Sequence, residues 1–314
     1  MQTPRARLRL LLRPGVAVPP PLFLPLVLAL AAKIEVLEFA EFLCNPTKLA
    51  KGLQALHQTL GTDGITCTCG AGLEIEALGA ELDWSVYPPR AVAAPPALLS
   101  LDPQGIAERV SRAPRIAAAA EATRRLAATC PGEPVLVVAL TGPGSLAKEM
   151  ANAMGIDPVM ALRNDTALLE IAGRTVLEVA RLILLAGANV VFLLERDRPA
   201  ADAARSGTWA SVVTPIANLA KFHKALTIML APPDAAPLPP AIVPCFPSGT
   251  TIGGGGNRLR AQAFGTDGLG WHFPDSAACV FTTDGELPAD TDIGALRAVC
   301  QAVRSELGRT KGAE

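Results

Sequence analysis

Two polar residues that could take part in proton chemistry stand directly at the ends of the most apolar segments of the chain. Thr141 closes the run 135–140, and Glu195 closes the run 188–194. Runs without polar alternation are typical of parallel strands covered on both faces, and the carboxyl ends of such strands are where α/β proteins place their ligands. A carboxylate at this edge can accept a proton or position a cation, so we expect a binding site there.

A glycine turn follows Thr141 and also favours a ligand site. Gly142, Pro143 and Gly144 supply the turn, Ser145 is a plausible N-cap, and a helix is expected to follow. The first turn of a helix presents unpaired N–H groups and the positive end of the helix dipole. An ordinary strand-to-helix turn is the alternative explanation of the same spacing.

The composition argues against several classes of partner. Hydrophobic residues make up 50% of the 314 residues and charged residues 18%, and the net charge is −1. That balance allows a large core but argues against a nucleic-acid surface or a broad polyanion site. The seven cysteines form no CxxC pair and no disulfide-like framework. Because this pattern suits a reducing compartment, we expect a cytoplasmic protein.

The N-terminal segment has two interpretations. Four arginines precede the apolar run 22–32, as in a secretory signal, and residues 28–33 loosely imitate a cleavage site. Five prolines between positions 14 and 25 interrupt the segment, however, and it lacks the uninterrupted run of about 18 apolar residues that a membrane span needs. We therefore expect no membrane span, a first buried strand over 23–30, and residues 1–20 disordered or extended.

Strand-like and helix-like segments alternate along the first two thirds of the chain. Helices are predicted from Asn45-Pro46 to 60, over 106–128 with a break at Pro114, and over 167–186, 209–224 and 292–307. Strands are predicted at 23–30, 65–69, 135–141, 189–194, 226–230, 242–246, 268–273 and 278–283, and residues 88–96 are predicted to form a loop.

These elements predict one α/β domain over residues 1–314, a (β/α)8 TIM barrel that is irregular in its last third. The irregularity follows from connections such as 274–278, which are too short for a crossover helix. An open doubly wound sheet is the rival architecture. The run Gly253 to Gly256 lacks GxGxxG spacing after a strand, so we interpret it as a mobile loop and not as a dinucleotide site.

Four segments of the chain, in matching order, resemble the uroporphyrinogen decarboxylase superfamily. They are ITCTCGAGLEIEALGAELDW, PVLVVALTGPGSLAKEM, AGRTVLEVARLILLAGANVVFLLE and TTDGELPADTDIGALRAVCQAV. The superfamily also contains methyltransferases that move methyl groups to or from corrinoid proteins, thiols or folate-type carriers. The resemblance runs from about Asn45 to Val303, and it implies a (β/α)8 barrel with its site at the carboxyl ends of the strands.

The chain departs from the decarboxylase pattern where that pattern binds its substrate. The arginine-rich segment that would hold a polycarboxylate is replaced by residues 28–33, in which Lys33 is the only cation. The catalytic aspartate of the family falls near Gly70, its helix tyrosine at Glu149 and its late histidine at Asp284. Because acids at these positions would repel a polyanion, we expect uroporphyrinogen not to be a substrate.

The zinc-dependent methyltransferases that the resemblance includes need a His-x-Cys after a middle strand and a late Cys. This chain has residues 229–232 near the first position and 282–286 near the second. Cys245, His272, Asp275 and Cys279 could instead be assembled into a metal site, although no two of them have the close spacing of a structural zinc site. We expect no tightly bound metal.

The side chains that remain at the expected mouth of the barrel are mostly acidic or hydroxylic. Catalytic roles are expected for Glu149, Glu195, His272 and Asp284, and substrate-binding roles for Cys69, Gly70, Thr141, Gly142, Asp197 and Asp275. Glu195 is the leading candidate because it ends an apolar strand, and a solvated loop acid is its alternative. For Cys69 the alternative is packing with Cys67 inside the barrel, and for His272 it is a place at the edge of the core.

Three functions remain open at this point. The first is a methyltransferase that moves a methyl group between a small-molecule substrate and a corrinoid or folate-type carrier, with a corrinoid protein as a partner. The second is a decarboxylase acting on uroporphyrinogen in porphyrin biosynthesis. The third is a non-catalytic barrel that serves as a binding or partner subunit.

Overall fold

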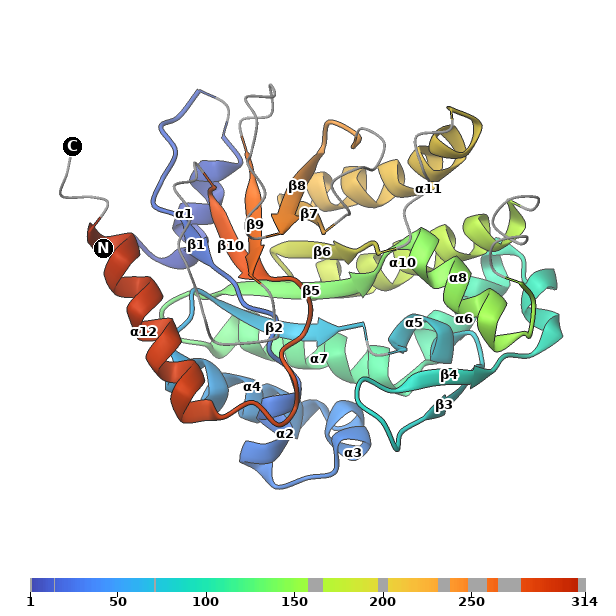
Figure 1. Ribbon diagram of the computed structural model, residues 1–314, viewed down its shortest axis with the longest axis horizontal. Helices are drawn as coiled ribbons and strands as arrows, with labels where there is room; N and C mark the ends of the chain where they lie inside the picture. Colours follow the sequence, from blue (N-terminus) through green and yellow to red (C-terminus); the bar gives the residue numbers. More distant parts are fainter. Residues whose placement is uncertain are drawn as a thin grey trace.

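Eight parallel strands form one sheet that curls into a nearly closed barrel (Figure 1). The computed structural model describes residues 2–13, 15–70, 72–157, 166–196, 203–230, 238–247, 259–264 and 278–309. In spatial order the strands are β1 (Leu22–Phe23), β10 (Val280–Thr283), β9 (Ala261–Phe264), β8 (Ile242–Pro247), β7 (Leu226–Leu230), β6 (Val190–Leu194), β5 (Val135–Thr141) and β2 (Gly64–Cys69). The predicted (β/α)8 barrel is confirmed, and the open doubly wound sheet is not the architecture.

Helices cover the outside of the barrel and supply the second layer of the core (Figure 1). The longer ones are α4 (Pro46–Leu60), α6 (Pro103–Arg112), α7 (Pro114–Thr129), α8 (Pro143–Ala153), α10 (Ala167–Leu185), α11 (Ala203–Phe222) and α12 (Ile293–Arg309). The shorter ones are α1 (Pro4–Leu11), α2 (Ala29–Glu35), α3 (Phe39–Cys44), α5 (Leu73–Ala77) and the 3-10 helix η1 (Pro96–Ser100). Prolines occupy the first position of both α6 and α7. The predicted break at Pro114 is the boundary between these two helices.

Helix α4 shows how local sequence positions these elements. The Asn45 side chain accepts a hydrogen bond from the Lys48 N–H at 3.1 Å, and Pro46 occupies the first helical position. The stripe of leucines at 49, 53, 56 and 60 is buried against the sheet and its neighbours. Gly61 then ends the helix with a φ of 66°, a left-handed conformation that glycine adopts without strain.

The last third of the barrel is irregular, as predicted. Within the described residues 238–247, 259–264 and 278–283, the strands β8, β9 and β10 are parallel and no helix accompanies them. Strand β9 was not predicted, and the predicted strand 268–273 lies outside the described residues, as does the glycine run 253–256.

Three expectations for the first hundred residues are wrong. Residues 4–11 are helical rather than extended, because Thr3 caps the helix, Pro4 starts it, and Leu8 and Leu11 are buried. The strand expected over 23–30 is reduced to β1, and α2 begins at Ala29. The expected loop 88–96 instead contains β4 (Arg90–Ala93), which pairs antiparallel with β3 (Glu81–Asp83).

Side chains, rather than a regular ladder, join the two ends of the sheet. No register links β1 to β2 in the described chain, and Pro25 cannot donate to one. Instead, the Thr66 hydroxyl donates to the Pro25 carbonyl at 3.1 Å, while the Val27 N–H donates to that hydroxyl at 3.3 Å. We call these contacts, together with those of Asp63, the closing seam.

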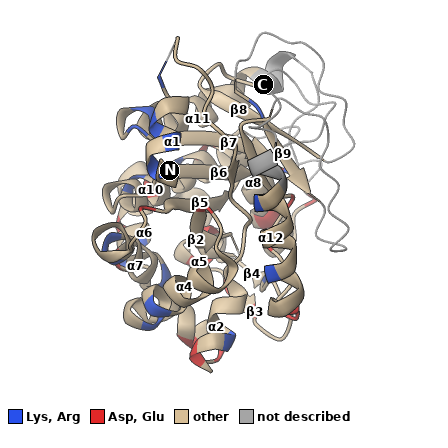
Figure 2. Ribbon diagram, turned by 90° about the vertical axis from the view of Figure 1, so that its left-hand side faces the viewer, with Lys and Arg blue, Asp and Glu red and all other residues tan. Residues whose placement is uncertain are grey.

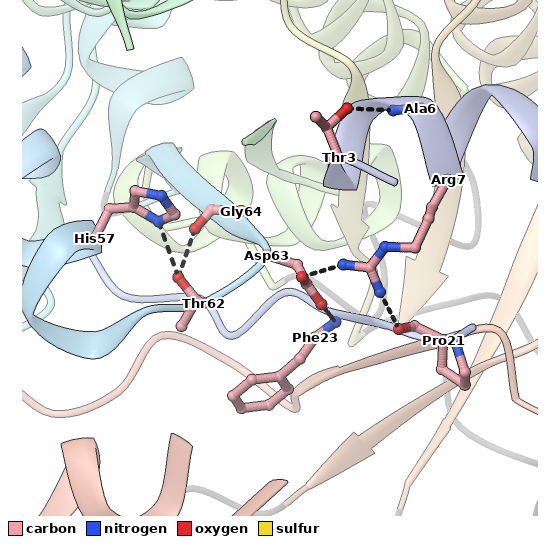
Figure 3. Close-up of polar contacts among 9 residues, drawn as sticks. All are labelled: Thr3, Ala6, Arg7, Pro21, Phe23, His57, Thr62, Asp63 and Gly64. Carbon is pink, nitrogen blue, oxygen red and sulfur yellow. Dashed lines mark hydrogen bonds and ion pairs between the residues drawn. The ribbon is translucent and has the colours of Figure 1, made fainter. Parts of the chain in front are cut away.

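Asp63 joins the seam to the N-terminal helix (Figure 3). Its backbone N–H donates to the Phe23 carbonyl at 3.1 Å, and its carboxylate accepts the Phe23 N–H at 2.9 Å. The guanidinium of Arg7 forms an ion pair with the same carboxylate and also donates to the Pro21 carbonyl at 2.9 Å. Helix α1 is therefore attached where the barrel closes.

Two surface properties limit the kinds of contact that the fold can make. Lys and Arg positions are distributed over α1, α4, α6, α7 and α12 in the view of Figure 2 and do not gather on one element. None of the helices in the described part of the chain has the length and apolar character that crossing a bilayer would require.

We predict that Asp63→Ala lowers the free energy of unfolding by about 3 kcal/mol, because it leaves Arg7 and the Phe23 N–H without their buried acceptor. Urea denaturation would measure the change. Glu108→Gln is the matched control, since it alters an exposed helical acid that lies 3.8 Å from Arg112, and it should change stability by less than about 0.5 kcal/mol. Equal stabilities of the two variants would contradict the role given to Asp63.

Candidate active site

The carboxyl ends of the strands carry most of the candidate residues that the structure describes. Cys69 ends β2, Thr141 ends β5, Glu195 follows β6 and Asp284 follows β10. Asp197, His272 and Asp275 lie outside the described residues. Apart from Asp284, the described candidates belong to three groups, which differ in burial and in their hydrogen-bond partners.

Glu195 is fully buried, with 0% of its surface exposed, so it is not a solvated loop acid. One carboxylate oxygen accepts the Gly144 N–H at 2.9 Å and the Trp209 indole N–H at 3.1 Å. The other accepts the Ser145 N–H at 2.7 Å and the Ser145 hydroxyl at 2.9 Å. Burial raises the pKa of Glu195, and these four donors oppose that rise because they favour the charged form.

The glycine turn therefore binds the carboxylate of Glu195, which belongs to the same chain, through its backbone N–H groups. Helix α8 begins at Pro143 with Gly142 as its N-cap residue, and not with the N-cap expected at Ser145. The amides of Gly144 and Ser145, which were expected to face a ligand, are bonded to Glu195. A Cβ on Gly142 would lie 2.7 Å from the Glu195 carboxyl carbon, so the absence of a side chain there makes room for the carboxylate.

A second acidic group surrounds Thr141. The buried carboxylate of Glu74, at the start of α5, accepts the Thr141 N–H at 2.8 Å and the Thr141 hydroxyl at 3.0 Å. Burial raises the pKa of Glu74, although the bonds from Thr141 lower it in part. Burial and the nearby Glu74 charge raise the pKa of Glu149 to about 7. Gly70, with a φ of 44°, brings the end of β2 close to the Thr141 hydroxyl.

A third group lies where β2, β10 and the β3–β4 hairpin meet. Glu286, three residues after β10, accepts the Ala29 N–H at 2.8 Å with one carboxyl oxygen. Burial raises its pKa to about 7, and the Tyr87 hydroxyl and the Cys69 thiol are among the groups that lower it. Burial and the nearby Glu286 raise the pKa of both Cys69 and Tyr87, which keeps the thiol and the phenol protonated.

A family model described as uroporphyrinogen decarboxylase (URO-D) matches residues 19–226, from the segment before β1 to the first residue of β7. The chain belongs to the uroporphyrinogen decarboxylase family. The match includes the strand ends that carry Cys69, Thr141 and Glu195, and it stops before Glu286. No curated protein matches the sequence.

The fold of this uroporphyrinogen decarboxylase family member is similar to that of a methyltransferase from Methanosarcina mazei. The two structures superpose with a TM-score of 0.62 at 16% sequence identity, over 98% of this chain and 99% of that chain. At this identity the likeness establishes the shared fold. The family match ends at residue 226, whereas the structural likeness covers 98% of the chain and so includes strands β7 to β10.

Sequence reasoning missed three members of these groups, namely Glu74, Tyr87 and Glu286. Glu74 and Glu286 each follow a predicted strand by a few residues, so the rule that selected Asp284 could have selected them. Tyr87 gave no such signal, because it lies just before the segment 88–96 that was expected to be a loop, and no hairpin was predicted there. Asp284 lies instead near Cys245, whose pKa is raised by burial and by the Asp284 charge.

The described residues give no support to a zinc site built from Cys245 and Cys279. Cys245 pairs with Ala261 on β9, which pairs with Val280 on β10, so the two cysteines stand on strands separated by two spacings, or about 9–10 Å. The Cys279 thiol donates to the Arg260 carbonyl at 3.0 Å. No cluster of three potential metal ligands occurs in the described ranges, and His272 lies outside them.

We predict that Gly142→Ala destabilises the protein by about 1–3 kcal/mol, because the added methyl group overlaps a carboxylate that four donors hold in place. Thermal or urea unfolding would measure this loss. Gly207→Ala, at an exposed position in α11 with no atom within 4 Å of the new methyl group, should be neutral or stabilising by up to about 1 kcal/mol. A Gly142→Ala variant as stable as the wild type would show that Glu195 is free to move.

The two carboxyls with a pKa near 7 predict a dependence of stability on pH. Because burial raises each pKa from an ordinary value of 4.5, their contribution is complete below about pH 4.5 and is lost as the pH rises through about 7. The free energy of unfolding should therefore fall between pH 5 and pH 8, by about 2 kcal/mol for the pair after allowance for partial solvent contact.

Variants separate this effect from the rest of the protein. Glu149→Gln and Glu286→Gln cannot ionise, so each should flatten the decline of stability measured by urea unfolding at a series of pH values. Glu108→Gln, on the exposed face of α6, should keep the wild-type slope. A slope that is identical in all four proteins would show that neither carboxyl titrates in this range.

Proposed function

We propose that this member of the uroporphyrinogen decarboxylase family is an enzyme that transfers a methyl group between a small-molecule substrate and a corrinoid or folate-type carrier. The observation that supports the proposal is the acidic character of the mouth. Glu74, Glu149 and Glu286 stand near the strand ends, and no ion pair joins any of the three to a cation among the described residues. A substrate that enters this space should be neutral or cationic.

The basic side chains that the structure describes near the mouth do not form an inward-facing cluster of the kind that a polyanion site needs. Arg115 is held by Glu76 at 2.8 Å and stacks over the Trp84 ring at 4.9 Å, so its charge is already compensated. Arg196 is exposed, and one of its guanidinium nitrogens would lie 3.0 Å from a Cβ on Gly285. A porphyrinogen with many carboxylates needs several such groups facing inward, which argues against decarboxylation as the activity.

Methyl transfer does not require the protein to form a covalent bond with the substrate. The carrier is a co-substrate that brings or receives the methyl group, and the protein must align the two reactants and manage one proton. Glu149, with a pKa of about 7, can exchange a proton with substrate at neutral pH. Glu195 supports the site indirectly, since its four bonds join the end of β6 to the first turn of α8 and to α11. We keep Asp284 as a further candidate at the opposite side of the mouth.

The assay that tests the proposal offers methylcobalamin or methyltetrahydrofolate as donor to a panel of small amines, thiols and alcohols. We expect methyl transfer with at least one pair, followed by the change in corrinoid absorbance or by mass spectrometry of the methylated product. Glu149→Gln should lower kcat/KM by about 10²-fold, in the lower range for loss of general acid–base catalysis, whereas Glu108→Gln should retain the wild-type value.

A parallel incubation with uroporphyrinogen identifies the rival function. Formation of coproporphyrinogen without methyl transfer would replace the proposal with decarboxylation. No turnover of either kind, with intact folding by circular dichroism, would favour the non-catalytic barrel that serves as a binding or partner subunit.

A further inference from the structure

Two polar atoms in the third acidic group are buried and make no conventional hydrogen bond in the part of the chain that the structure describes. They are the hydroxyl oxygen of Tyr87 and the second carboxyl oxygen, Oε2, of Glu286. The first carboxyl oxygen of Glu286 is already bonded to the Ala29 N–H at 2.8 Å. Because a buried polar group without a partner costs about 1–3 kcal/mol, such groups need an explanation, and a bound ligand is one.

Two elements that are far apart in the sequence bring the Tyr87 hydroxyl and the Glu286 carboxyl near each other. Tyr87 lies in the β3–β4 hairpin, where its ring packs edge-on against Phe39 with ring centroids 5.1 Å apart. Trp84 of the same hairpin packs against Phe39 at 6.4 Å and beneath the Arg115 guanidinium. Glu286 follows β10, and a side-chain interaction between Tyr87 and Glu286 shifts the pKa of each, although neither the Tyr87 hydroxyl nor Oε2 has a partner in hydrogen-bond geometry among the described residues.

The charges around the pair select the class of ligand. The Cys69 thiol at the end of β2 is kept protonated by burial and by Glu286, and Glu74 also lies near it. Among the described residues, the positive groups that lower the pKa values in this region are Arg115, which is paired with Glu76, and the exposed Arg196. A carboxyl and a phenol offer acceptors for N–H groups, and an additional carboxylate ligand would add to the negative charge already present.

We propose that the Glu286 carboxyl and the Tyr87 hydroxyl bind the nitrogen of a small primary or secondary amine, which makes an amine the substrate of this site. The inference rests on the proposed methyl transfer for its chemical step, and on the two unpartnered atoms for its binding step. The phenol oxygen accepts one N–H from the amine. Glu286 accepts the second N–H.

The chemical step is balanced when the neutral amine is the methyl acceptor. Its nitrogen lone pair forms the new N–CH3 bond, while the bond from the methyl group to the carrier breaks and leaves its electron pair on the carrier. The neutral amine forms because ionised Glu286 first receives one proton from the bound ammonium, and the methylated nitrogen then leaves the site as an ammonium ion. Glu286 is suited to this exchange because it titrates close to neutral pH.

Isothermal titration calorimetry with propylamine as the probe tests the binding step without turnover. Wild-type protein should bind propylamine more tightly than propionate or propanol, and at pH 7 binding of the ammonium form should release a proton, detected by comparing buffers of different ionisation enthalpy. Glu286→Gln should weaken propylamine binding at least about 10-fold and abolish the proton release. Tyr87→Phe, which keeps the ring packing, should weaken it by about 2- to 10-fold.

Glu108→Gln is the matched control and should bind propylamine as the wild type does. Unchanged binding and unchanged proton release in Glu286→Gln would overturn the inference, as would tighter binding of propionate than of propylamine. If Glu286→Gln does not fold, the same comparison with Tyr87→Phe gives the answer.

The test also separates this inference from the proposed function. If propylamine binding depends on Glu286 but no acceptor is methylated, the proposed function is contradicted and the amine site is supported. Methyl transfer to thiols or alcohols, combined with no binding of propylamine, would overturn the amine site alone.

Discussion

The barrel depends on closing a sheet whose first strand is only two residues long. Pro21 and Pro25 flank β1 and supply no N–H, so the edge that faces β2 cannot be joined by a full ladder. Asp63 and Thr66 provide side-chain acceptors and donors in its place, and Arg7 attaches α1 to the same point. These contacts connect β1 and the residues after it to β2, where no strand ladder does so in the described chain.

Several carboxyl groups are buried around the mouth of the barrel, and they differ in how their charge is compensated. Glu195 is compensated by four donors and joins β6, α8 and α11, so its charge stabilises the framework around the mouth. Burial raises the pKa of Glu149 and Glu286 to about 7, although the Ala29 N–H and neighbouring side chains lower that of Glu286 in part. The protein therefore contains two kinds of buried acid. Glu195 is fixed by its hydrogen-bond donors, whereas Glu149 and Glu286 can exchange a proton near neutral pH and are suited to acid–base chemistry.

The β3–β4 hairpin gives the mouth a wall that the eight strands alone would not provide. It lies between β2 and the following helices in the sequence, and it contacts α3 through Phe39 and the end of α8 through the bond from the Ala94 N–H to the Ala153 carbonyl. Its tip introduces an aromatic hydroxyl beside a carboxyl from the far end of the chain. The hairpin therefore adds buried polar groups beside the carboxyl ends of β2 and β10.

The sequence by itself determined the parts of this protein that depend on local physics. Apolar runs such as 135–140 predicted strands, the Asn45-Pro46 start and Gly61 end predicted α4, and the order of the elements predicted the barrel, because strand and helix periods and capping residues act over a few neighbours. Sequence also placed Glu195 at a strand end. Only the tertiary structure decided that Glu195 is enclosed by donors from α8 and α11, and that Tyr87 meets Glu286. These partners lie far apart in the chain, and the burial that sets their pKa values exists only after the barrel has closed.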